Sequence, residues 1–308
     1  MDWISIVVVV LGLCLFEIVS SIDNAVINAE VLATMSPKAR RWFLIYGIFI
    51  AVFLVRGMLP WLIVFVMNPG IGPIGALIAT FSNDPHIIES IEQSAPILML
   101  GGGVFLLFLF LHWLFIEDKS FGLHSEKMFQ KHGAWFYAIV SVILVVIVAM
   151  AQKINPMLAL SAVIGSSAFF ITDGFKRNAE ENEQKLLSNS TGMSDISKIL
   201  YLEIIDTTFS IDGVLGAFAF TMSVPLIILG NGLGAIVVRQ LTIGNIENIK
   251  KYVFLKNGAM YSIFCLGLVM VLEGFGIEVP TLASPLITVV IVTFFFLKSR
   301  SHAKQLAT

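Results

Sequence analysis

Charged residues are scarce in this chain. They make up 13% of its 308 residues, whereas a soluble domain carries about 25%. Hydrophobic residues make up 57%, and the mean hydropathy is +0.91. This composition excludes an ordinary soluble domain, and without a basic stripe we expect no nucleic-acid partner. Separate apolar runs indicate an all-α, polytopic helical membrane protein rather than a barrel.

Residues and motifs typical of soft-metal sites and of catalysis are also few. The two cysteines, Cys14 and Cys265, lie in apolar runs, which excludes a disulfide framework and favours packing roles. The metalloprotease pattern His-Glu-x-x-His does not occur. Two intramembrane aspartates could form an aspartyl-protease dyad, but no Gly-x-Gly-Asp accompanies Asp212. We therefore expect a protein that is not an enzyme.

The apolar runs predict about nine membrane spans. They cover about 3–33, 42–67, 96–116, 134–151, 156–172, 199–223, 225–246, 256–276 and 280–297. The most polar connection, 173–198, is predicted to be a cytoplasmic linker. It divides the chain into a first membrane half, 1–172, and a second membrane half with its tail, 199–308.

Lysine and arginine predict the orientation. Sixteen of the nineteen lie in the loops and tail of one side, or in Lys256 at a helix end, whereas the opposite side holds only Lys153. Positive loops stay in the cytoplasm, so the C-terminus is predicted to be cytoplasmic and the N-terminus outside. The two remaining cations, Arg56 and Arg239, fall within predicted spans.

The first span contains a polar stretch, FEIVSSIDNAVINAEV, at residues 16–31. Glu17 and Asp23 stand six residues apart in it, with Ser21 and Asn24 nearby. A charge at bilayer depth costs of order 2.5–3.5 kcal/mol on insertion scales, so an intramembrane carboxylate indicates a functional site with a partner.

The pattern recurs in the second half. Asp206, Ser210 and Asp212 align with Glu17, Ser21 and Asp23, and Gly213 takes the place of Asn24. Arg239 lies about as far into the next span as Arg56 does in the first half. Because the two motif helices are predicted to run in opposite directions, we expect an inverted repeat of three-helix units, an architecture found in many secondary transporters.

Positions i and i+6 do not share a helical face, so the two acids of each motif require a local break to meet. Ser, Asp, Asn and Gly all weaken a helix interior. We therefore expect two interrupted helices that form one oxygen-rich cage. An all-oxygen cage suits Mn²⁺, Mg²⁺ or Ca²⁺. Glu17, Asp23, Asp206 and Asp212 are the predicted ligands, and Glu203 extends the entry path.

Arg56 and Arg239 can each pair with a carboxylate. Four acids and two arginines leave two negative charges, which one divalent ion or two protons would balance. That balance is consistent with metal–proton exchange. The alternative role for each arginine is a structural clamp between helices, and the two roles are compatible.

These motifs, with their arginines, resemble TerC-type integral membrane proteins, specifically the branch labelled a domain of unknown function. The resemblance runs from about residue 3 to 297 and implies manganese efflux across the bacterial inner membrane, with no permanently bound cofactor. It implies a metal site of Glu17, Asp23, Asn24, Asp206 and Asp212, with Ser21 and Ser210 supporting it. Gly213 departs from the serine frequent in relatives, which could shift the metal preference.

One alternative is an exporter of a small organic solute. The other is a resistance-associated membrane protein without metal transport. We expect a divalent cation and the lipid bilayer as partners, and the sequence leaves homo-oligomerisation open.

Overall fold

The computed structural model describes residues 2–47, 50, 57–58, 61, 65, 72–81, 85–119, 123–188, 194–244 and 251–307. Within its helices, some side chains lie outside the description, among them those of Asp23 and Asn24. The side chains of the predicted ligands Asp23 and Asn24, and the whole of Arg56, therefore lie outside the described part of the chain. All regular structure in the described ranges is helical, so the all-α class is confirmed for them.

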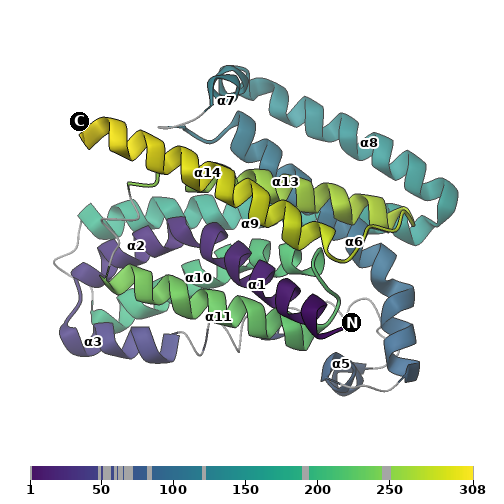
Figure 1. The fold of residues 1–308 in the computed structure, drawn as a ribbon, viewed down its shortest axis with the longest axis horizontal. Coiled ribbons are helices and arrows are strands. Elements are labelled where there is room, and N and C mark those ends of the chain that lie inside the picture. The colour runs from purple at the N-terminus through teal and green to yellow at the C-terminus, as the bar shows by residue number, and fades with distance from the viewer. Residues whose placement is uncertain are drawn as a thin grey trace.

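The described helices follow one another along the chain as shown in Figure 1. They are α1 (Trp3–Ser20), α2 (Ile22–Ala33), α3 (Pro37–Trp42), the π-helical turn η1 (Phe43–Gly47), α5 (Gly72–Phe81), α6 (Pro85–Phe115), α7 (His124–Gln130), the 3₁₀ turn η4 (Gly133–Trp135), α8 (Phe136–Ile154), α9 (Pro156–Ser188), α10 (Asp195–Phe218), α11 (Val224–Gly244), α13 (Leu255–Gly274) and α14 (Ala283–Ala307).

Seven described segments are long and apolar enough to cross a membrane, as expected for a multi-pass membrane protein. They lie at 3–20, 94–115, 133–154, 156–178, 224–241, 255–274 and 283–303. The predicted span 42–67 falls largely outside the described residues. The predicted span 199–223 is occupied by the helix α10, which is not one of the seven. The count of nine spans therefore stays a prediction.

Helix α6 packs against both α9 and α13 through a run of three glycines (Figure 1). A Cβ at Gly101 would lie 2.9 Å from the Ser161 carbonyl oxygen on α9. A Cβ at Gly103 would lie 2.9 Å from the Gly267 carbonyl oxygen on α13. Small residues let helix backbones approach closely where hydrophobic burial cannot drive association in lipid. The glycine run therefore lets α6 contact two helices at close range.

Aromatic side chains complete the core beside these close contacts. The ring of Phe169 on α9 lies edge-on to Phe105 and Phe108 of α6, with centroids 6.1 and 5.9 Å away. All three side chains are almost fully buried. Edge-to-face pairs of this kind contribute about 0.5–1.5 kcal/mol beyond the area that they bury.

Helix α1 packs against α11 and α14. A Cβ at Gly230 of α11 would lie 2.5 Å from the Cβ of Leu13, and one at Gly12 would lie 2.9 Å from the Cβ of Pro285 on the α14 side. These glycine positions set how closely the first helix, which carries Glu17, approaches its neighbours.

The predicted break in the first span is present, but it is small. Helix α1 ends at Ser20 and α2 begins at Ile22. The Ser21 amide still donates to the Glu17 carbonyl at 3.1 Å, so no turn is unwound there. The predicted break in the second motif is wrong, because α10 is continuous through Asp212 and Gly213. Tertiary packing overrides the weak helix propensity of that pair.

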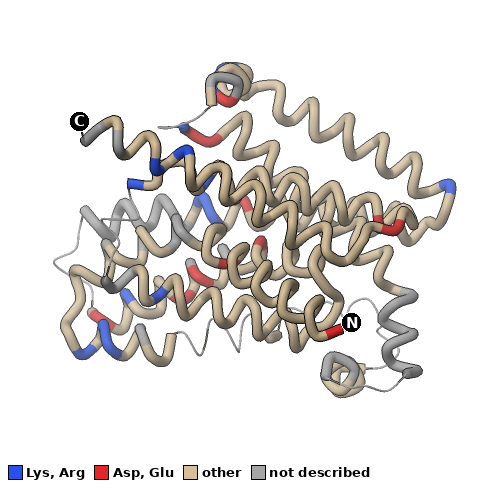
Figure 2. Tube along the Cα trace, in the orientation of Figure 1, with Lys and Arg blue, Asp and Glu red and all other residues tan. Residues whose placement is uncertain are grey.

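Most described lysines and arginines lie toward the end of the bundle at which the C-terminus is found (Figure 2). The opposite end includes the last turn of α8, with Lys153. The N-terminus also lies away from the basic end (Figure 2). The structure therefore separates the two ends by charge.

Candidate functional site

Glu17 is buried in a notch that α1 forms with α10 and α11. Its side chain is 1% exposed, and one carboxylate oxygen accepts a hydrogen bond from the Ser21 hydroxyl at 2.7 Å. A Cβ at Gly213 of α10 would lie 3.1 Å from Glu17 Oε2, and one at Gly234 of α11 would lie 2.6 Å from Glu17 Cβ. Two glycines on neighbouring helices thus make the space for this carboxylate.

Asp206 forms an ion pair with Arg239, which joins α10 to α11. The guanidinium Nη2 donates to Asp206 Oδ2 at 2.9 Å, and Nη1 donates to the Phe43 carbonyl at 2.9 Å. The guanidinium also lies over the Phe43 ring, 4.2 Å from its centroid. Asn28 of α2 donates weakly to Asp206 Oδ1 at 3.4 Å. Arg239 is therefore held by three groups and anchors Asp206 firmly.

Glu203 lies one turn before Asp206 on α10 and is close to the same guanidinium. A Cβ at Gly47 would collide with Glu203 Oε1 and lie 2.9 Å from Arg239 Nη1. Both Glu203 oxygens are buried without a hydrogen-bond donor among the described residues. Because an ionised carboxylate is costly to bury alone, this group requires a nearby cation or a proton.

Asp212 is the second acid of the α10 motif, and its partner is Lys176 of α9. The ammonium forms an ion pair with Asp212 Oδ2, and both side chains are 13% exposed. Asp212 Oδ1 is buried without a hydrogen-bond partner among the described residues. The two motif aspartates, about 9 Å apart along an ideal helix, thus have different cationic partners.

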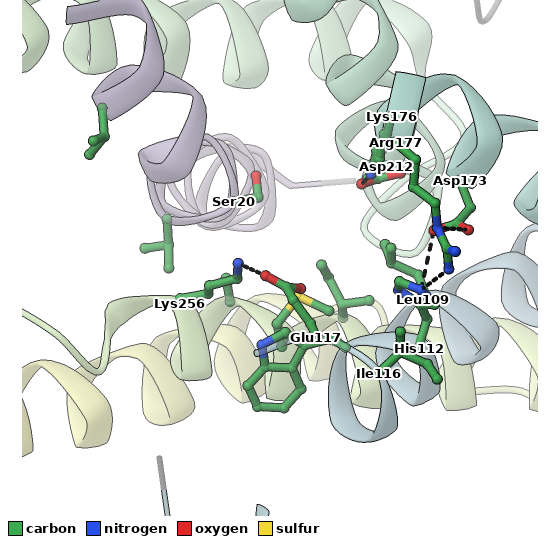
Figure 3. A pocket seen from close by; sticks show the side chains of 16 residues that line it. Ser20, Leu109, His112, Ile116, Glu117, Asp173, Lys176, Arg177, Asp212 and Lys256 are labelled. Atoms are coloured by element: carbon green, nitrogen blue, oxygen red, sulfur yellow. Dashed lines mark hydrogen bonds and ion pairs between the residues drawn. The ribbon is translucent and has the colours of Figure 1, made fainter. Parts of the chain in front are cut away.

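A cavity of about 530 Å³ opens beside this pair. Figure 3 shows Asp212 and Lys176 on one side of it and Ser20 of α1 on another. Helices α6 and α13 form further walls, with Leu109, Ile263 and Met260 among the apolar lining residues. The cavity therefore connects the α10 motif with the ends of α6 and α13.

Two further sets of paired, charged side chains line the same cavity (Figure 3). On one wall, Lys256 pairs with Glu117 across the ends of α13 and α6. On another, Asp173 Oδ2 lies 3.0 Å from Arg177 Nε, while its Oδ1 lies 3.3 Å from His112 Nε2. Arg177 Nη2 also lies 3.0 Å from that histidine nitrogen. The cavity wall thus alternates carboxylates with cations.

No group of three or more His, Cys, Asp or Glu side chains is placed to hold one metal ion among the residues that the structure describes. Among the described acids, Asp206 and Glu203 lie beside Arg239, Asp212 lies beside Lys176, and Glu17 accepts from Ser21. Ser210 donates to the Asp206 carbonyl at 2.5 Å and so supports its own helix. The five-ligand site, which includes the undescribed side chains of Asp23 and Asn24, stays a prediction.

Lys176 and Asn28 are the partners that sequence reasoning did not assign. Lys176 lies within the predicted linker 173–198, but α9 continues as a helix to Ser188. The signal was available, because Asp173, Lys176 and Arg177 follow an apolar run at the i, i+3, i+4 spacing of one helical face. His112, near the end of α6, also lines the cavity.

Residues 22–305 match the family described as "Protein of unknown function (DUF475)", which spans most of the chain. No curated protein and no solved structure matches this chain.

Proposed function

We propose that this chain, which belongs to the DUF475 family of proteins of unknown function, transports a divalent metal cation across a membrane. One observation carries the proposal: among the described residues, four buried or partly buried carboxylates lie between helices, in contact with or close to two cationic side chains. The acids are Glu17, Glu203, Asp206 and Asp212, and the cations are Lys176 and Arg239. The described side chains alone, with all six ionised, carry a formal charge of −2, which one divalent ion or two protons would balance.

The chemistry of these groups favours a hard cation. Carboxylates, the Asn28 amide oxygen and the Ser21 hydroxyl are oxygen donors, as Mn²⁺, Mg²⁺ and Ca²⁺ prefer. The Asn28 oxygen is buried and has no hydrogen-bond partner among the described residues. We propose Mn²⁺ as the cargo on the resemblance to TerC-type proteins, with Asp23 and Asn24 completing the ligand set. A transporter of this kind is not an enzyme and needs no resident cofactor.

The cavity beside Asp212 supports a route to these acids. It reaches from Ser20 and Asp212 to Glu117, just after α6, and Lys256, at the start of α13, which adjoin the lysine-containing segments 117–133 and 247–255 at one end of the bundle. On the positive-inside bias, that end faces the cytoplasm. We propose a multi-pass protein of the bacterial inner membrane, with its N-terminus outside, that loads its cargo from the cytoplasmic side and exports it.

An inverted repeat is part of the same proposal. The contact of α6 with α13 joins the third helices of the two proposed units, and α1 of the first unit packs against α11 of the second. With α10 and the span 42–67 included, nine spans would give the two motif helices opposite directions. Alternating access could then proceed by movement of one unit against the other.

A second candidate is an exporter of a small organic solute. The specific observation in its favour is the cavity wall, which balances three carboxylates with three cationic side chains. A cavity of about 530 Å³ falls within the range of roughly 300–1,000 Å³ that is usual for small-molecule sites. A zwitterion such as an amino acid would match both charges.

Transport by purified protein in liposomes tests the proposal. Mn²⁺, Mg²⁺ and Ca²⁺ are supplied in turn, with and without an imposed pH gradient, and labelled neutral and basic amino acids serve as comparison cargo. We expect uptake or release of Mn²⁺ by the wild type, and its loss in Asp212→Asn. Glu278→Gln, at an exposed carboxylate after α13, is the matched control and should transport normally.

Two results would contradict the proposal. Wild-type transport rates in Asp212→Asn would show that the assigned acid is not part of the route. Transport of an amino acid without any divalent-ion flux would favour the second candidate instead.

A further inference from the structure

We infer that Lys176 is a tethered cation that competes with the transported ion for Asp212. The inference deepens the proposed function and rests on it. Lys176 reaches Asp212 from α9, whereas the motif acids belong to α1, α2 and α10. The ammonium thus occupies a position at the carboxylate that a cargo cation also requires.

The two cations of the site are held differently. Arg239 bonds to Asp206 and to the Phe43 carbonyl and stacks on the Phe43 ring, so its release would break several contacts at once. Lys176 is a point charge on a flexible four-carbon stem, and both it and Asp212 line the open cavity. Lys176 therefore faces the cavity from which a cargo cation would arrive, on a side chain long enough to move within it.

The cavity also offers the ammonium another carboxylate. Asp173 lies one turn earlier on the same helix and lines the same cavity, where it pairs with Arg177. Side chains at i and i+3 are neighbours on a helix surface. A cation that binds Asp212 from the cavity can thus displace the ammonium toward Asp173 (Figure 3), and departure of the cargo restores the original pair.

Competition of this kind makes opposite predictions for two substitutions. Lys176→Met removes the competitor, so Mn²⁺ should bind more tightly. Hydrogen bonds to charged groups contribute about 1.5–3 kcal/mol, which corresponds to a gain of about 10- to 100-fold in affinity. Lys176→Arg supplies a planar, bidentate partner for the carboxylate, so Mn²⁺ should bind about tenfold more weakly or worse.

The experiment is calorimetric titration of Mn²⁺ into the purified full-length protein in lipid nanodiscs. Lys256→Met removes another cation of the same cavity, one that pairs with Glu117. It therefore measures how far the Mn²⁺ affinity changes when the cavity loses a positive charge elsewhere than at Asp212. We expect it to change the affinity less than threefold. Lys153→Met, at the opposite end of α8, should have no effect.

The outcomes separate this inference from the proposed function. Unchanged Mn²⁺ affinity in both Lys176→Met and Lys176→Arg would overturn the inference while leaving metal transport intact. Equal changes in Lys176→Met and Lys256→Met would also overturn it. If Lys176→Met does not fold, Lys176→Arg, which keeps the charge, still decides. A wild type that binds no divalent ion would overturn the proposed function itself.

Discussion

Glu17 of α1 lies against Gly213 of α10, and a Cβ at residue 213 would be only 3.1 Å from its carboxylate oxygen. The two residues belong to the two acidic motifs, which are almost 200 positions apart in the chain. The contact gives this glycine a packing role: it makes room for the Glu17 carboxylate.

Substitution at the two glycines around Glu17 should have unequal effects. In Gly234→Ala, the new Cβ would lie 2.6 Å from Glu17 Cβ and 2.8 Å from the Cys14 carbonyl, so the α1 backbone must shift. We expect a loss of about 1–3 kcal/mol, the usual range for overpacking. In Gly213→Ala, only the mobile end of Glu17 must move, and the loss should be smaller. Thermal unfolding in detergent measures both, and equal losses would contradict this account.

Two glycines of α9 provide a matched test of the close contact with α6. A Cβ at Gly165 would collide with the Gly101 carbonyl oxygen and lie 3.0 Å from its Cα, whereas a Cβ at Gly174 meets nothing within 4 Å. Gly165→Ala should therefore destabilise the fold by several kcal/mol. Gly174→Ala should be neutral, or stabilise by up to about 1 kcal/mol through better helix propensity. The yield of monodisperse protein and its unfolding temperature distinguish the two.

Arg239 should be essential to stability only while Asp206 is charged. Arg239→Met leaves the Asp206 carboxylate without its guanidinium, and breaking a buried ion pair from one side costs about 3–5 kcal/mol. The double variant Arg239→Met with Asp206→Asn removes both charges and should recover much of this loss. A double-mutant cycle of unfolding temperatures measures the coupling. No recovery in the double variant would mean that the contacts with Phe43 dominate.

A hydrogen bond between Ser36 and Asp195 joins the N-termini of α3 and α10, and its contribution to stability should depend on pH. The Ser36 hydroxyl donates to Asp195 Oδ2 at 2.5 Å, and this hydrogen bond lowers the pKa of Asp195, a group outside the predicted spans. A carboxyl with a lowered pKa in the folded state stabilises the fold above its unfolded pKa. That stabilisation is lost as pH falls through the folded pKa.

Ser36→Ala should therefore lower the unfolding temperature at neutral pH, and the difference from wild type should narrow below about pH 4, near the ordinary aspartate pKa. Unfolding temperatures measured from pH 7 downward check this expectation. Asp195→Asn, which removes the titrating group, is the control and should show no such narrowing with Ser36→Ala added. A difference independent of pH would contradict the assignment.

The sequence by itself determined the class of the protein and most of its spans. Hydrophobicity and run length are properties of the chain alone, and the bilayer imposes a minimum length on each crossing. Seven of the nine predicted spans coincide with helices long and apolar enough to cross. Burial of Glu17 was expected for the same reason, since it lies within an apolar run.

Tertiary structure alone decided which groups meet. Lys176 pairs with Asp212 and Arg239 with Asp206 because helix packing brings α9 and α11 beside α10, which residue spacing cannot specify. The continuity of α10 was likewise decided by packing, which outweighed the weak propensity of Asp212–Gly213. The cavity beside them depends on how six separate helices are placed in space, and no local pattern in the chain encodes it.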